Sequence, residues 1–289
     1  MTPLLFGNDH PAKPAAPTTA AKPAPAAKPS ALGQAKPPEP KPPEAKPTAP
    51  PKKAQVRHAS RATGHDVVNV SDSGGGHGAG PQHDPDDVLQ ELKQGNKRFV
   101  SGRSLHPRYG MSRLRETSSG GQHPFACILS CADSRVPPEA IFDQGVGDLF
   151  TVRVAGNVAN NDEIASLDYA IEHLNVPVVV VMGHTACGAV TAVVNEDRVP
   201  TSIAQLVKHI GEAVLRTRRY NPSLKGKDLV EESVRVNVWE SVEDMLRGSE
   251  MIAARVRTGM LRVAGAVYHL DTGEVEWLGA YPGALSILR

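Results

Sequence analysis

Proline is concentrated at one end of this chain, and its distribution limits what that end can fold into. Fifteen of the 25 prolines fall between Pro3 and Pro51, among Ala and Lys in repeats such as AKPAPAAKPS. Proline fixes φ and lacks a backbone donor, so neither a helix nor a sheet is expected across this stretch. We predict an extended, polyproline-like spacer, with docking to a partner or to an envelope polymer as the alternative.

The next segment changes composition but stays poor in apolar residues. Residues 54–83 add Gly, Ser and His, as in SDSGGGHGAGPQH. Nothing pre-organises the irregularly spaced histidines, so a metal site is a minor alternative here; these residues are His58, His65, His77 and His83. We therefore predict a disordered tail over residues 1–83 and one folded domain over residues 84–289, which is long enough for a sizeable core.

Charge and hydropathy exclude several classes of function. Lys and Arg number 32 against 31 Asp and Glu, so no basic excess indicates a nucleic-acid partner. The longest apolar run, Val176 to Met182, is far shorter than the ~20 residues of a membrane span. The start MTPLLFGNDH lacks the pattern of a secretory signal. We expect a cytoplasmic location, with a periplasmic or cell-envelope location as the alternative because of the Pro-rich tail.

Strand and helix patterns alternate through the rest of the chain. A capped, amphipathic helical arm is expected from Asp84 to Val100, interrupted by Gly95. Alternation of this kind predicts an α/β fold with a mainly parallel sheet flanked by helices. Strands are expected at 125–130, 149–154, 176–182 and, as a strand–turn–strand unit, at 261–278; helices are expected at 164–174, 203–219 and 230–257.

Two polar clusters, SCADSR at 130–135 and GHTACG at 183–188, each follow one of these apolar strands. Ligands bind at the carboxyl ends of strands in open α/β sheets, which is where both clusters fall. The three cysteines are too few and odd in number for a disulfide framework, so they are expected to be metal ligands or buried groups.

The side chains in these clusters are typical zinc ligands. Two thiolates and an imidazole, from Cys131, His184 and Cys187, suit a tetrahedral ion of borderline softness. Asp133 is either the fourth ligand or a neighbour of the fourth position. Ordinary core residues remain the alternative for all of them. Cys127 shares a strand face with Cys131 but is expected to be a small buried side chain.

The pairing of CADSR with HTACG resembles the β-class carbonic anhydrases. The segments LKQGNKRFVSG, FDQGVGDLFTVRVAGN and LDYAIEHLNVPVVVVMGHTACG are also similar to that family, so the likeness runs from about Val88 to the C-terminus. The resemblance implies reversible hydration of CO₂ to bicarbonate by a zinc-bound hydroxide, one Zn²⁺ per chain, and a homodimer or homotetramer. It also implies that the N-terminal arm packs on a second protomer.

Carried over residue by residue, the resemblance implies the following roles. Cys131, His184 and Cys187 hold zinc, and Arg135 either holds Asp133 off the metal or releases it to become the fourth ligand. The implied substrate-binding residues are Gln122, Phe150, Ala155, Tyr169 and Gly188.

One departure from the family pattern concerns regulation. Relatives with a non-catalytic bicarbonate site resemble one another in a Trp where this chain has Ile128; Arg153 and Tyr268 lie near that site's other two positions. We therefore expect the open form, with Asp133 free of the metal, at neutral pH. The alternatives to CO₂ hydration are a hydrolase of CS₂ or COS using the same residues, and a zinc-binding structural module without turnover.

Overall fold

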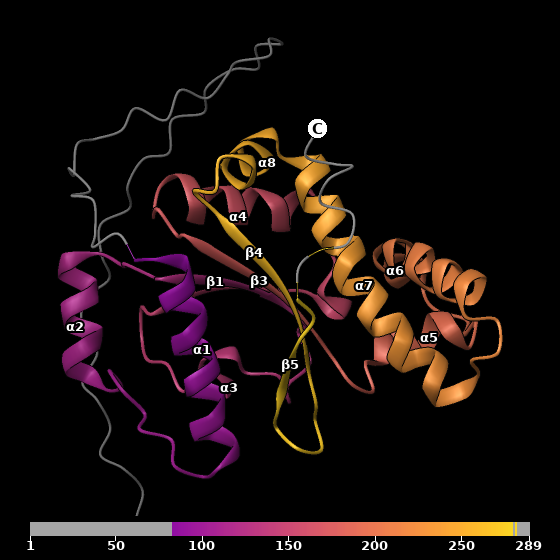
Figure 1. The fold of residues 1–289 in the computed structure, drawn as a ribbon, viewed down its shortest axis with the longest axis horizontal. Helices are drawn as coiled ribbons and strands as arrows, with labels where there is room; N and C mark the ends of the chain where they lie inside the picture. Colours follow the sequence, from indigo (N-terminus) through magenta and orange to yellow (C-terminus); the bar gives the residue numbers. More distant parts are fainter. Residues whose placement is uncertain (1–82, 280, 282–289) are drawn as a thin grey trace, which may run out of the picture. The chain divides into compact units, whose positions relative to one another are not determined.

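The fold was analysed in a computed structural model, which describes residues 83–279 and residue 281 (Figure 1). Apart from His83, the predicted tail with its histidines lies outside the described residues, and the boundary at residue 84 stays a prediction. The elements are α1 Pro85–Val100, α2 Met111–Gly120, β1 Ala126–Ser130, α3 Pro138–Ile141, β2 Leu149–Arg153, the 3₁₀ turn η1 Ala155–Asn157, α4 Asn161–Glu172, β3 Val178–His184, α5 Gly188–Val194, α6 Thr201–Tyr220, α7 Gly226–Gly248, α8 Glu250–Arg257, β4 Arg262–Tyr268 and β5 Val275–Trp277.

The sheet confirms the predicted α/β architecture. Its strand order is β2-β1-β3-β4-β5. The first four strands pair in parallel, and β5 adds an antiparallel edge to β4. Every residue of β1 and of β3 is buried, because helices cover both faces of the sheet. That is why the sequence of β3 begins with four consecutive valines instead of alternating polar and apolar residues.

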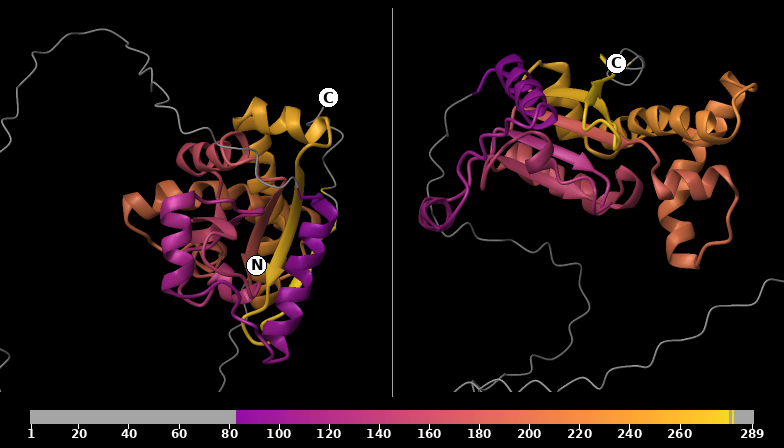
Figure 2. Two further views of the ribbon diagram at one scale, coloured as in Figure 1. Left: turned by 90° about the vertical axis from the view of Figure 1, so that its left-hand side faces the viewer. Right: turned by 90° about the horizontal axis from the view of Figure 1, so that it is seen from below.

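Alternate positions along the strands supply two separate cores. Cys127, Leu129, Val179 and Val181 face α4, α7 and α8. Ile128, Val180 and Met182 face the other way, against α1 and α3. Figure 1 shows α1 on one side of the sheet and α7 and α8 on the other, and Figure 2 shows the same layering in two further views. Beside this sandwich, α6 packs on α5 and α7.

The N-terminal arm starts as predicted and packs on the chain's own core. Asp84 caps α1 by accepting a hydrogen bond from the Asp86 N–H at 2.8 Å. Gly95 does not interrupt the helix: a Cβ there would lie 1.8 Å from the Phe142 carbonyl oxygen, so glycine permits a close approach. Val88 and Leu92 are buried in the chain's own core. One face of the arm therefore packs on its own sheet, and its packing on a second protomer stays a prediction.

The other differences lie in the helices. The single helix expected over 230–257 is two helices, because Ser249 adopts an extended conformation and caps α8. The short helices α2, α3 and α5 were not predicted. None of the helices within residues 83–279 is both long and apolar enough to cross a membrane.

Candidate metal centre

Three of the predicted ligands converge at one end of the sheet. Cys131 directly follows β1, His184 is the last residue of β3, and Cys187 is the N-cap of α5. Since β1 and β3 are parallel neighbours, their carboxyl ends lie together. One ligand atom from each residue lies within 4.8 Å of the other two, and all three residues are buried. The adjacent strand ends thus bring distant parts of the sequence into one group.

His184 is oriented for metal binding. The side chain is 0 % exposed. Its Nδ1 lies 2.9 Å from the carbonyl oxygen of Thr185, which accepts a hydrogen bond and so places the proton on Nδ1. Among the described residues, Nε2 has no hydrogen-bond partner. A buried nitrogen without a partner is costly, and a bound metal ion removes that cost. This observation shows that the residues present fit a metal.

The two thiols differ in their surroundings. The Cys131 Sγ accepts a hydrogen bond from the Gly156 N–H at 3.3 Å. A hydrogen bond from the Cys187 thiol is the largest cause that lowers the pKa of Cys131, and the Gly156 N–H acts in the same direction, whereas burial opposes them. Sharing that proton raises the pKa of Cys187. The donors around Cys131 therefore favour its thiolate, which is the form that binds a metal.

Cys127 lies outside this group of ligands. It is fully buried in the strand face that packs on α4 and α7, and burial raises the pKa of its thiol. The neutral thiol therefore behaves as a small apolar side chain.

Asp133 lies beside the ligand group and is paired with Arg135. Its Oδ2 is 2.8 Å from Arg135 Nη2, and its Oδ1 accepts hydrogen bonds from Arg135 Nε at 3.0 Å and from the Arg135 backbone N–H at 2.9 Å. These bonds hold the pKa of Asp133 well below its usual range. The same Oδ2 is 4.0 Å from His184 Nε2. The carboxylate is thus near the group but held by the guanidinium.

Arg153 braces the loop that carries Cys131 and Asp133. Its guanidinium donates to the Cys131 carbonyl at 3.1 Å and to the Asp133 carbonyl at 2.7 Å. In the neighbouring core, Ile128 and Tyr268 are buried. Two nitrogen atoms of the Arg153 guanidinium are therefore already hydrogen-bonded within the chain. Ile128, which stands where the family pattern has Trp, is a core residue.

The predicted pocket residues occupy different positions around the group. The Phe150 and Tyr169 rings lie 6.1 Å apart, and Tyr169 is 44 % exposed. Ala155 and Gly188 are exposed at the starts of η1 and α5, next to Cys131 and Cys187. In the sheet register, Phe150 lies opposite Cys127, four residues before Cys131. The roles of these four residues in a substrate pocket stay predictions.

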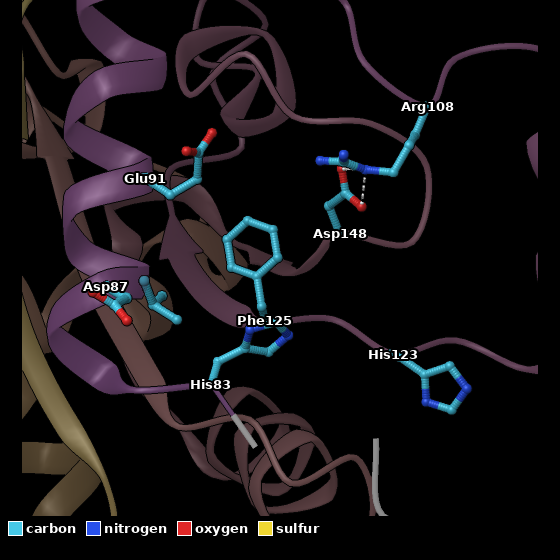
Figure 3. A pocket seen from close by; sticks show the side chains of 8 residues that line it. His83, Asp87, Glu91, Arg108, His123, Phe125 and Asp148 are labelled. Carbon is cyan, nitrogen blue, oxygen red and sulfur yellow. Dashed lines mark hydrogen bonds and ion pairs between the residues drawn. The ribbon is translucent and has the colours of Figure 1, made fainter. Parts of the chain in front are cut away.

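Gln122 is not brought to the group within one chain. It is exposed in the segment before β1, whereas the ligands follow the carboxyl end of that strand. The strand has 5 residues, about 16 Å in length. His123 is next to Gln122 and lines a cavity of about 580 Å³ (Figure 3). The other residues lining that cavity are His83, Asp87, Val88, Glu91, Arg108, Phe125 and Asp148.

The cavity in Figure 3 lies apart from the candidate metal centre, since none of Cys131, His184 and Cys187 lines it. Figure 3 shows Arg108 bound to Asp148, with His123 directed away from the pair. The His83 ring lies edge-on to Phe125, with 6.0 Å between the ring centroids. His123 precedes the amino end of β1, whereas Cys131 follows its carboxyl end.

Sequence reasoning missed the part that the backbone of Gly156 plays. The residue lies in the VAGN segment that follows β2, and its N–H reaches the Cys131 sulfur. A glycine shortly after a strand, adjacent to the predicted pocket residue Ala155, was the available signal. Only the pairing of β2 with β1 shows which atom the N–H faces.

Three protein ligands beside a free carboxylate are typical of a catalytic metal site, because a structural site has four protein ligands. The family profile described as carbonic anhydrase matches residues 126–275. Carbonic anhydrase 2 of Mycobacterium tuberculosis is 40 % identical over 197 residues, a match covering 67 % of this chain and 92 % of that protein.

Solved structures agree with the sequence comparison. The β-carbonic anhydrase CcaA superposes with a TM-score of 0.52 at 31 % identity, covering 67 % of this chain and 92 % of that one. A tetrameric β-carbonic anhydrase from Sordaria macrospora has the same fold, with a TM-score of 0.55 at 21 % identity, covering 67 % and 98 %. This chain belongs to the β-class carbonic anhydrase family and is a metal-binding lyase.

Proposed function

We propose that this protein hydrates CO₂ reversibly to bicarbonate and a proton, with one Zn²⁺ per chain as its metal. The observation that carries the proposal is the buried Cys131–His184–Cys187 group beside a carboxylate that Arg135 holds. Two sulfurs and one imidazole nitrogen match the preference of zinc for soft and borderline donors. When bound there, zinc supplies a hydroxide nucleophile near neutral pH by lowering the pKa of water to about 7.

Asp133 and Arg135 control the orientation of the nucleophile. The ionised Asp133 carboxylate accepts a hydrogen bond from the attacking oxygen and so directs the oxygen's lone pair toward the substrate carbon. The bidentate pairing with Arg135 keeps that carboxylate ionised and restrains it from the ligand group. A catalytic metal site needs this restraint because it keeps the fourth metal position open. A structural site, in which a fourth protein ligand binds the metal permanently, does not need it.

The substrate pocket must suit a small uncharged molecule. CO₂ offers few hydrogen-bonding options, so apolar walls with one polar contact are sufficient to hold it. Phe150, Ala155 and Tyr169 supply apolar surface, and the open backbone at Gly188 lets the substrate approach. The substrate-orienting role of Gln122 stays a prediction, because a single chain leaves it exposed before β1.

Stopped-flow CO₂ hydration by zinc-quantified protein tests this proposal. Two thiolate ligands donate more charge than imidazoles, so we expect activity to rise with pH, from about one unit below neutrality to two above it. A flat or falling profile at one zinc per chain would contradict the proposed nucleophile. No turnover of CO₂ by zinc-loaded protein would direct the same assay to COS and CS₂.

We also propose that the protein is a homodimer or a homotetramer. Helix α2 has no buried residues, and it and the segment before it expose Leu105, Tyr109, Met111 and Leu114. Clustered exposed apolar side chains are typical of protein–protein contacts. The Sordaria macrospora enzymes that share this fold are tetrameric.

A further inference from the structure

The Gly156 N–H that bonds to the Cys131 sulfur depends on an unusual backbone conformation. Gly156 has φ of 76°, in the left-handed region that glycine adopts readily. Its N–H lies 3.3 Å from the Cys131 Sγ. Because glycine is also the residue with the most backbone freedom, something else must keep this N–H directed at the sulfur.

Two contacts on the other side of Gly156 restrict that freedom. A Cβ at this position would lie 2.5 Å from Cδ1 of Ile210 in α6, so Ile210 packs directly against the backbone of Gly156. The Gly156 carbonyl oxygen accepts a hydrogen bond from Asn237 Nδ2 at 2.8 Å. The peptide unit that follows Gly156 is therefore anchored by α7, while the peptide unit that precedes it points to the metal ligand.

Asn237 is an unusual residue for its place in α7. It is 1 % exposed and lies in the same buried helix as Val234 and Val238, which belong to the apolar core. Among the described residues, its Oδ1 has no hydrogen-bond partner, so the bond to Gly156 is the side chain's one recorded polar contact. A buried amide held by one hydrogen bond is costly in an apolar core, and stability alone would favour leucine here.

We propose that Asn237 is a positioning residue of the metal centre, which holds the Gly156 carbonyl so that the Gly156 N–H stays bonded to the Cys131 sulfur. It acts through Gly156 and touches neither metal nor substrate. Groups behind metal ligands orient those ligands, and their loss weakens metal affinity by about 10- to 100-fold. The inference rests on the proposed zinc site, because it concerns how one of its ligands is held.

The test compares Asn237→Leu, which keeps the branched shape of the side chain but lacks the donor, with Asn237→Ala, which lacks both. Zinc affinity is measured in the full-length protein by competition with a chromophoric chelator. We expect both variants to bind zinc about 10- to 100-fold more weakly than the parent protein. In the Co²⁺-substituted protein, we expect the thiolate-to-cobalt charge-transfer band to move to longer wavelength, because a sulfur without its N–H donor gives up an electron more easily.

Ser233→Ala is the matched control. Ser233 is buried in the same helix one turn earlier, and its hydroxyl has no partner among the described residues. We expect this variant to keep both the affinity and the band of the parent. Parent-like affinity and band position in folded Asn237 variants would overturn the inference, and so would an equal loss in Ser233→Ala.

Two further results distinguish failure of the Asn237 inference from failure of the proposed function. Failure of both Asn237 variants to fold, judged by circular dichroism, would also overturn the inference, because Asn237 would then be required for the whole fold. If the parent protein itself does not bind zinc, the proposed function fails, whatever the variants show.

Discussion

Arg135 shows how an exposed side chain controls a buried site. More than half of its side chain is in contact with solvent, yet its fork geometry engages both oxygens of Asp133. The usual worth of an exposed ion pair is small. Here its value lies in where it keeps the carboxylate, because Asp133 Oδ2 is 4.0 Å from the ligand nitrogen of His184.

We predict that Arg135→Ala lowers CO₂ hydration about 10- to 100-fold, because the freed Asp133 competes for the fourth metal position. The pKa of Asp133 would rise toward its ordinary value but stay well below neutrality, so the loss should persist at neutral pH. Stopped-flow assays at constant zinc content measure the effect. Arg219→Ala, at an exposed position in the last turn of α6, should retain parent activity. Equal activity of the two variants would show that the pair has no role in catalysis.

The elements around the sheet are joined by buried charges as well as by apolar packing. Arg98, in the last turn of α1, lies 2.6 Å from the buried Asp143 carboxylate, which follows α3. The same carboxylate accepts hydrogen bonds from the N–H groups of Leu105 and His106 at 3.0 and 2.9 Å. One aspartate thus ties α1, the segment that follows it and α3 together.

We predict that this aspartate makes stability depend on pH. Burial alone would raise the pKa of Asp143, but the Leu105 N–H, Arg98 and the His106 N–H outweigh burial and lower it. A lowered pKa stabilises the fold above the unfolded value of about 4, and the stabilisation disappears as pH falls through the lower folded pKa. Asp143→Asn should therefore cost about 3 kcal/mol of unfolding free energy at pH 7.

Urea unfolding at neutral pH and at about pH 3 checks this prediction, because the difference between parent and variant should shrink in acid. If parent and variant differ by the same unfolding free energy at both pH values, the charge of Asp143 contributes nothing to stability. Asp162→Asn, at an exposed position in the first turn of α4, serves as the control and should show a much smaller effect at either pH.

The junction between α7 and α8 depends on Ser249. Its hydroxyl donates to Asp168 Oδ1 at 2.6 Å and accepts from the Ile252 N–H at 3.2 Å. We predict that Ser249→Ala destabilises the fold by about 1–2 kcal/mol through loss of the cap. Thermal or urea unfolding measures the change, and Ser119→Ala at an exposed position in α2 is the control. Because the metal ligands lie elsewhere, a large loss of zinc content in Ser249→Ala would contradict this local interpretation.

Across the whole molecule, the metal ligands and helix α2 belong to opposite ends of strand β1. The ligands lie beyond the carboxyl ends of β1 and β3, while α2 and Gln122 precede the amino end of β1. The exposed apolar residues of α2 and of the segment before it are therefore free to contact another copy without covering the chain's own ligand group.

We predict that light scattering gives a mass of two or four chains. Leu114→Glu should lower that mass, because a charge in an apolar contact is costly to bury. Leu215→Glu changes another exposed leucine, in α6, and should leave the mass unchanged. A single-chain mass for the parent protein would refute the proposed homo-oligomer, and equal effects of the two variants would place the contact elsewhere.

Local chemistry was sufficient to predict much of this structure. Asp84 and Pro85 marked the start of α1, and the valines of β3 indicated a strand buried on both faces. Predictions failed where the outcome depended on distant residues. Gly95 was expected to interrupt α1, but the approach of the Phe142 carbonyl makes glycine suitable there. The end of α7 at Ser249 likewise depends on Asp168, which is 81 residues away in the sequence.

The sequence by itself determined the ligand types, their places after apolar strands and the family to which the chain belongs. Those properties depend on residue chemistry and short spacings, which a linear sequence displays directly. Only the tertiary structure decided that Arg135 holds Asp133, that the Gly156 N–H reaches Cys131 and that Asn237 anchors Gly156. The last two contacts join residues 25 and 81 positions apart, and such contacts depend on strand order and helix packing, which no local pattern encodes.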